Sequence, residues 1–202
     1  LELGGKNPNV IFADCNYDKM LETTLRSSFA NQGQICLCGS RILVEAPLYE
    51  RFRDDFVEHT QALIVGDPQD AGVNLGAVVS EPHMSKILSY FDLAQEERGT
   101  ILCGGKRKTV SGRCENGWFI EPTVIEGLDM NCRTNQEEIF GPVVTIMPFS
   151  SEDEALALAN STPYGLSATV WTENISRAHR FGAQIEAGVI CCLLYTSPSP
   201  RD

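Results

Sequence analysis

The sequence has few histidines, and none of them lies near a cysteine pair. Histidine occurs only at positions 59, 83 and 179, and the eight cysteines form no Cys-x-x-Cys motif. Because structural zinc is usually held by four ligands in close pairs, we predict no metal. No secretory leader is visible in the 202 residues, which favours free thiols in a reducing compartment over disulfides.

Long apolar runs are also missing. A membrane-spanning helix needs roughly 18 consecutive apolar residues, and the longest run, at positions 187–194, reaches about half of that. The sequence begins at Leu1 without a methionine or a basic leader. We therefore expect a cytoplasmic protein with no membrane partner, and a chain that starts inside a longer one.

Basic residues are scarce. The chain has 16 Lys and Arg against 27 Asp and Glu, a net charge of −11, and its only basic cluster is at positions 106–108. Nucleic-acid binding depends on clustered basic side chains, so we expect no nucleic-acid partner and interpret the cluster as a solvated loop. A hydrophobic content of 43% predicts a globular domain with a buried core.

Apolar periodicity predicts alternating strands and helices. Leu21, Leu25 and Phe29 are spaced by four, as on one helix face, before a stop at Gly33. Helices are predicted at 18–32, 47–63, 81–98, 155–160 and 176–185, and strands at 9–13, 40–45, 101–103, 118–125, 143–149, 166–171 and 188–191, with an exposed loop at 104–117. This alternation predicts an α/β fold with a parallel-type sheet covered by helices on both faces.

The pattern stops at the end of the chain. Residues 194–202 read Leu-Tyr-Thr-Ser-Pro-Ser-Pro-Arg-Asp, without an apolar face, and resemble adaptor or vector sequence read in frame. We predict a domain over 1–190 and a non-native, adaptor-like tail over 191–202.

Three segments carry candidate chemistry. In the first, Glu2 lies between two leucines and beside a glycine pair. An apolar setting disfavours the charged carboxylate and raises its pKa towards the range of a general base. The alternative is an edge-strand carboxylate that points to water.

In the second segment, Cys36 follows the helix stop at Gly33 in a polar, glycine-rich stretch, with Cys38 two residues later. A partly exposed thiolate is a competent nucleophile. The alternative is that both cysteines are small buried apolar residues. The third segment, Glu137 to Pro142, places two carboxylates and Phe140 before a buried strand, although an acidic turn at that place is common.

Taken together, the segments resemble the aldehyde dehydrogenase superfamily. Positions 1–8 and 29–40 match its glutamate and cysteine active-site signatures, and 138–142 resemble its Glu-x-Phe-Gly-Pro cofactor segment. The order and the 34 positions from Glu2 to Cys36 also fit. The likeness extends to about residue 190, and residues 26–38 resemble most the muconic semialdehyde branch, which includes a kynurenine-pathway enzyme.

The resemblance implies an NAD(P)-dependent oxidation of an aldehyde, with NAD as the cofactor. Cys36 would be the nucleophile that forms a thiohemiacetal and then a thioester, and Glu2 the base that activates the hydrolytic water. It also implies cofactor contacts at Leu3, Gly4, Glu138 and Phe140. The substrate pocket would be lined by Ile35 and Leu37. Lys86, near His83 in the predicted helix at 81–98, falls where the family contacts the adenosine ribose, but we interpret both as exposed helix residues.

The resemblance further implies a fold that is incomplete at both ends. A longer protein would supply most of the cofactor domain and form a homo-oligomer, a dimer or a tetramer, while this chain alone would be inactive. Two alternatives stay open. One is a cofactor-independent thiol esterase that pairs Cys36 with His83 or His179, and the other is a non-catalytic fragment with exposed apolar surface.

Overall fold

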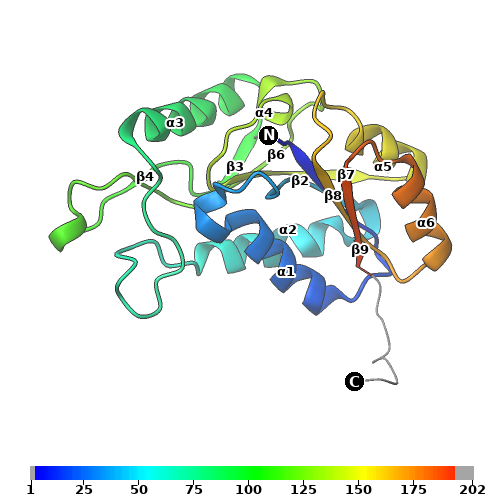
Figure 1. The fold of residues 1–202 in the computed structure, drawn as a ribbon, viewed down its shortest axis with the longest axis horizontal. Helices are drawn as coiled ribbons and strands as arrows, with labels where there is room; N and C mark the ends of the chain where they lie inside the picture. Colours follow the sequence, from blue (N-terminus) through cyan, green and yellow to red (C-terminus); the bar gives the residue numbers. More distant parts are fainter. Residues whose placement is uncertain (1–2, 194–202) are drawn as a thin grey trace.

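The computed structural model describes residues 3–193, which form a central sheet flanked by helices (Figure 1). The sheet has the strand order β3-β6-β7-β2-β1-β8-β9. Its strands are β1 (Asn7–Ile11), β2 (Gly39–Glu45), β3 (Thr100–Cys103), β6 (Thr123–Glu126), β7 (Val143–Phe149), β8 (Ser167–Trp171) and β9 (Val189–Leu193). All neighbours pair in parallel except β3, which is antiparallel to β6. The predicted α/β class is confirmed.

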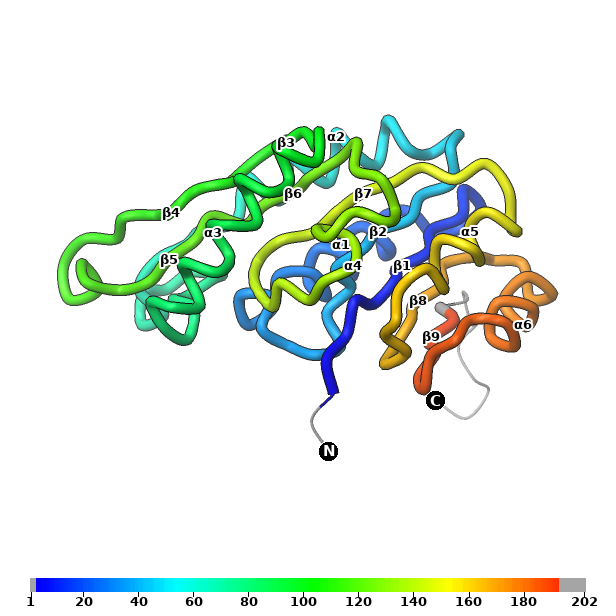
Figure 2. The backbone as a smooth tube through the Cα atoms, turned by 90° about the horizontal axis from the view of Figure 1, so that it is seen from above, coloured from blue at the N-terminus to red at the C-terminus, as the bar shows by residue number. Residues whose placement is uncertain are grey.

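Helices cover both faces of the sheet because its strands are apolar on both sides. On β2, Ile42 and Val44 pack in the core cluster under α1 (Tyr17–Phe29) and α2 (Ala46–Gln61). Leu43 points to the opposite face, covered by α5 (Glu152–Ala159) and α6 (Ile175–Gln184). On that second face α3 (Glu81–Glu96) packs over β6 and β7. Figure 2, seen from above, shows the strands side by side across the molecule.

Side-chain caps explain where four of the helices begin. Asn16, Ser80, Ser151 and Asn174 each accept a hydrogen bond from the backbone N–H three residues later, before α1, α3, α5 and α6. Pro at the first turn of α2 and α3 needs no donor there. Helix α5 therefore begins at Glu152, earlier than the predicted start at 155.

Two boundaries differ from the prediction for local reasons. Helix α1 ends at Phe29, because Asn31, Gln32 and Gly33 all adopt positive φ and form a tight 3-10 turn, η1 (Ala30–Gly33). The stretch predicted as one strand at 118–125 is divided at Pro122 into β5 (Phe119–Ile120) and β6. Strand β5 pairs with β4 (Arg107–Lys108) inside the predicted loop.

Two short helical segments were not predicted, α4 (Arg133–Gln136) and a 3-10 turn, η2 (Gly112–Cys114). Strand β9 runs through Cys191 and Cys192 to Leu193, in register with β8. The predicted tail boundary at residue 191 therefore falls within a paired strand, and positions 194–202 lie outside the described residues. In the described part, no helix is long and apolar enough to cross a membrane.

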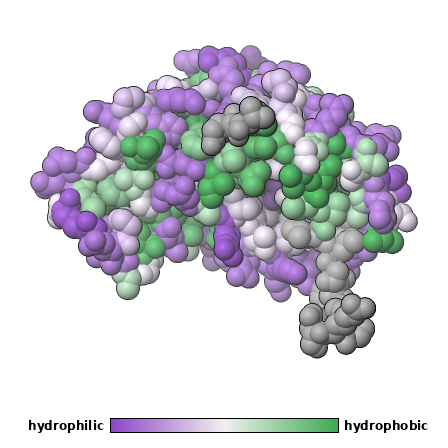
Figure 3. All heavy atoms as spheres, in the orientation of Figure 1, coloured by the Kyte–Doolittle hydropathy of each residue, from purple (hydrophilic) through white to green (hydrophobic). Residues whose placement is uncertain are grey.

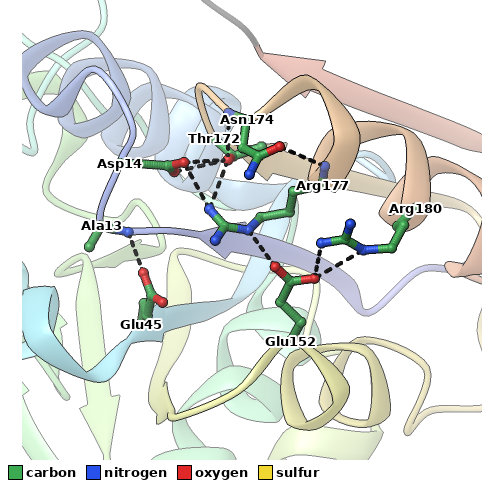
Figure 4. A network of polar contacts seen from close by, with 8 residues as sticks. All are labelled: Ala13, Asp14, Glu45, Glu152, Thr172, Asn174, Arg177 and Arg180. Carbon is green, nitrogen blue, oxygen red and sulfur yellow. Dashed lines mark hydrogen bonds and ion pairs between the residues drawn. The ribbon is translucent and has the colours of Figure 1, made fainter.

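A polar network fixes α6 against the sheet (Figure 4). Arg177 bonds to Asp14 and Glu152, each at 2.8 Å, and its guanidinium carbon lies 4.2 Å from the centre of the Phe12 ring. Arg180 adds a second contact to Glu152. This arginine-centred network lies beyond the carboxyl end of β1, whereas the candidate site lies at the amino end.

Candidate active site

An open cleft of about 610 Å³ lies at the amino ends of β1, β2 and β7. It is lined by Leu3, Gly4, Gln34, Ile35, Cys36, His83, Lys86, Glu138 and Phe140. Figure 2 shows the segment that leads into β1 beside the loop that leads into β2. Six of the eight predicted site residues border this cleft; Leu37 does not, and Glu2 lies outside the described residues.

The position of the cleft follows from the strand order. Ligands of open parallel sheets usually bind at the carboxyl ends of the strands, whereas this cleft lies at their amino ends. Here β7, β2 and β1 are neighbours, and each is preceded by a segment that carries candidate residues. Segments far apart in the sequence therefore meet at the end of the sheet where these three strands begin.

The turn that carries Cys36 is held by a buried amide. Asn7 Nδ2 donates to the carbonyls of Cys36 and Cys38, at 2.7 and 2.9 Å, and Asn7 Oδ1 accepts from Ser167 N at 3.1 Å. Cys38 is buried, which raises the pKa of its thiol, whereas Cys36 is half-buried and borders the cleft. Cys36 is thus the thiol that a ligand in the cleft can reach.

The Glu137–Glu138 pair divides into two roles. Glu138 Oε1 accepts from Gly5 N at 2.9 Å, and its Oε2 would lie 2.7 Å from a Cβ at Gly4. Glu137 instead bonds to Arg133, at 2.7 and 3.1 Å, which with Tyr90 lowers the pKa of the Glu137 carboxyl. Of these two carboxylates, Glu138 borders the cleft and Glu137 does not.

The side chains of segment 138–140 divide between the cleft and the core. Glu138 and Phe140 border the cleft, while Ile139 is 3% exposed and packs in the core with α3. The sequence placed a carboxylate and a ring at the beginning of a strand, and the structure has them just before β7.

His83 and Lys86 both lie on α3 and border the cleft. Lys86 is exposed, as interpreted, whereas His83 is half-buried. His83 Nε2 donates to the Phe140 carbonyl at 2.6 Å, and Lys86 Nζ to the Glu138 carbonyl at 2.9 Å. Within residues 3–193, the side-chain hydrogen bond at Cys36 comes from Asn7, and none joins Cys36 to His83 or His179. The pairing that a thiol esterase would need is therefore not formed in the described part.

Lys6 lies directly behind the glycine pair and is 2% exposed. Burial, and secondly the charge of Arg41, lower its pKa from 10.5 to about 7. Arg41 Nε donates to the Lys6 carbonyl at 2.9 Å, and its other nitrogens donate to the last carbonyls of α5, at 2.7 and 2.9 Å. The basic side chains of Lys6 and Arg41 are therefore both buried behind the glycine pair.

Sequence reasoning missed Asn7, Gln34 and Lys6. The signal for Asn7 is a polar residue before proline at the start of an apolar strand, and for Lys6 its place after two glycines. Neither pattern reveals burial, which depends on segments more than 100 residues away. Among residues 3–193 no group of three or more His, Cys, Asp or Glu side chains could hold a metal ion.

Comparison with known proteins identifies the family. The model of the aldehyde dehydrogenase family matches residues 1–200. The chain belongs to the aldehyde dehydrogenase family. This aldehyde dehydrogenase chain is 46% identical over 188 residues to 2-aminomuconic 6-semialdehyde dehydrogenase of Pseudomonas sp, covering 93% of the chain and 38% of that relative. It is 46% identical over 192 residues to 2-aminomuconic semialdehyde dehydrogenase of Mus musculus, covering 94% and 39%.

The fold comparison agrees. The NAD+ complex of betaine aldehyde dehydrogenase from Staphylococcus aureus superposes with a TM-score of 0.90 at 38% identity, over 97% of this aldehyde dehydrogenase chain and 39% of that one. The resemblance to the superfamily and its muconic semialdehyde branch is confirmed. The chain spans less than two fifths of the length of these relatives.

Proposed function

We propose that this chain carries the catalytic residues of an NAD-dependent aldehyde dehydrogenase that oxidises a muconic-type semialdehyde to the carboxylate. The observation that supports it is that Cys36, Glu138 and Phe140, which come from distant parts of the sequence, line the same cleft. The muconic semialdehyde substrates in the names of several relatives support the substrate class.

In this mechanism Cys36 attacks the aldehyde carbon through its thiolate and keeps the acyl group as a thioester until water releases it. The Cys36 backbone N–H stabilises the oxyanion. Glu2, which lies outside the described residues, takes the proton of the hydrolytic water. NAD, when bound, supplies the hydride acceptor.

The described residues fit the nicotinamide end of NAD. A cleft of about 610 Å³ lies in the usual size range of ligand pockets. Gly4 leaves free the space in which a Cβ would approach Glu138, so that backbone and carboxylate can both reach a ligand. We assign Glu138 and Phe140 to the ribose and the ring, the backbone of Leu3 and Gly4 to the nicotinamide, and Ile35 and Leu37 to the substrate pocket.

The larger context is part of the same proposal. Residues 1–190 would belong to the catalytic domain of a longer, homo-oligomeric cytoplasmic enzyme, and 191–202 would be the non-native tail. The remaining length of the relatives would supply most of the cofactor site, so this chain alone would neither bind NAD tightly nor turn over.

The test is a hybrid in which residues 1–190 replace the aligned segment of the Pseudomonas enzyme. We expect NAD-dependent oxidation of a muconic semialdehyde analogue, abolished by Cys36→Ala. Cys191 is exposed, so Cys191→Ala, made in a hybrid extended to residue 193, is the matched control and keeps full activity. NADH formation that survives Cys36→Ala would refute the assignment, and normal turnover by the isolated chain would refute its predicted inactivity.

A further inference from the structure

One face of α3 carries side chains that bond to the cofactor segment in order. His83, Lys86 and Tyr90 are spaced as i, i+3 and i+7, which places them on one side of the helix. Tyr90 Oη donates to Glu137 Oε2 at 2.5 Å, Lys86 Nζ to the Glu138 carbonyl at 2.9 Å and His83 Nε2 to the Phe140 carbonyl at 2.6 Å. We call these three residues the α3 stripe.

The contacts follow the order of the two elements. Along α3, His83, Lys86 and Tyr90 bond in turn to residues 140, 138 and 137. Helix and segment therefore run in opposite directions, and each later residue of the stripe bonds to an earlier residue of the segment. Ile87 completes the contact, because a Cβ at Gly141 would lie 2.5 Å from its Cδ1.

The contacts hold a strained backbone conformation at Phe140. Phe140 has φ +61°, a left-handed conformation that is unfavourable for a bulky residue. The His83 bond to the Phe140 carbonyl fixes the peptide, and the two rings pack edge to face at 6.1 Å. The direction of the Phe140 ring into the cleft therefore depends on α3.

The start of α3 is also tied to the nucleophile loop. Gln34 Oε1 accepts from Val79 N at 3.0 Å, and Ser80, the next residue, caps the helix by accepting from His83 N at 3.3 Å. Glu138 in turn accepts from Gly5 N. Hydrogen bonds thus join the four segments around the cleft, and α3 contacts two of them.

We propose that His83, Lys86 and Tyr90 are positioning residues, which set the Glu138 carboxylate and the Phe140 ring in the geometry that receives the nicotinamide riboside. They act through the backbone of 138–140 and the Glu137 carboxylate. This inference rests on the proposed function for its cofactor, but the placement of Glu138 can be measured without it.

The first measurement uses the chain itself. The Gly5 amide donates to Glu138 Oε1, so its hydrogen exchange reports the position of that carboxylate. In the double variant His83→Phe/Lys86→Met, we expect Gly5 to exchange about tenfold faster, as for the loss of one hydrogen bond, while amides of β1 and β2 keep their rates. His83→Gln, which keeps an N–H donor, restores protection relative to His83→Phe. Lys19→Met, on the exposed side of α1, is the charge-matched control.

The second measurement uses the active hybrid. We expect the double variant to raise the KM for NAD about tenfold with a smaller change in kcat. Unchanged Gly5 exchange, or Gly5 exchange that increases only together with the whole sheet, overturns the positioning role. Altered Gly5 exchange with an unchanged KM for NAD overturns the cofactor role. A hybrid that is inactive before mutation counts against the proposed function, while Gly5 exchange still decides whether α3 positions Glu138.

Discussion

Replacement of Lys6 by methionine should stabilise the protein, and more at low pH than at high pH. The Lys6 side chain is 2% exposed, and its pKa falls from 10.5 to about 7 because burial and then Arg41 disfavour the ammonium. Each pKa unit corresponds to about 1.4 kcal/mol. Below pH 7 the folded protein therefore loses about 5 kcal/mol to this charge, which is absent from Lys6→Met.

The sign of the pH dependence follows from proton counts. Between pH 7 and 10.5 the unfolded chain keeps the Lys6 proton that the folded chain has released, so the stability of the unmodified protein rises with pH there. We expect the advantage of Lys6→Met to fall from about 5 kcal/mol at pH 6 to about 1 kcal/mol at pH 10.

Urea unfolding followed by circular dichroism at several pH values measures this difference. Lys19→Met removes the same charge from an exposed position on α1 and should change the free energy of unfolding by less than about 0.5 kcal/mol at every pH. A Lys6→Met effect that is destabilising below pH 7, or that does not vary with pH, would refute the reasoning.

Three further substitutions test individual contacts by the same unfolding assay. Gly33→Ala should cost more than about 1 kcal/mol, because Gly33 has φ +68° and a Cβ there would lie 2.1 Å from the Gly141 carbonyl oxygen; full stability would contradict this contact. Arg41→Met should cost about 3 kcal/mol, since it leaves the last α5 carbonyls unpaired, and a cost below 1 kcal/mol would be evidence against that role. Asn7→Leu should cost about 2 kcal/mol and change the rate of alkylation of Cys36 by iodoacetamide, because it frees the turn; an unchanged rate would show that Asn7 does not hold the thiol.

Prediction and structure agree at the core strand β7 and differ at the end of helix α1. The apolar run at 143–149 predicted β7 with its observed bounds, because a strand buried on both faces needs a continuous apolar run. Helix α1 ends at Phe29, three residues before the predicted end. Asn31 and Gln32 adopt a left-handed backbone conformation there, which residues other than glycine rarely adopt and which the sequence pattern therefore does not predict.

Figure 3 shows hydrophobic residues gathered across the middle of the face that Figure 1 presents, with hydrophilic residues around the left and upper margins. Leu3, Ile35, Leu37 and Val79 are exposed, by 58%, 38%, 52% and 71%. Leu3 and Ile35 border the cleft, and Val79 bonds to the nucleophile loop. Apolar periodicity would assign such residues to a core. The family resemblance placed Leu3 and Ile35 at the site instead, and the folded chain shows both beside the cleft.

The sequence by itself determined the α/β class, the family and the reactive residue types, since periodicity and contiguous signatures are local properties of the chain. The family resemblance had named Glu138 and Cys36, and the structure shows that Glu138 and not Glu137 borders the cleft and that Cys36 is more accessible than Cys38. Tertiary structure alone decided that Lys6 is buried. It also decided the role of α3, whose stripe meets a segment about 50 residues away. Burial and hydrogen-bond partners arise from contacts between distant segments, and these contacts exist only once the strands have paired.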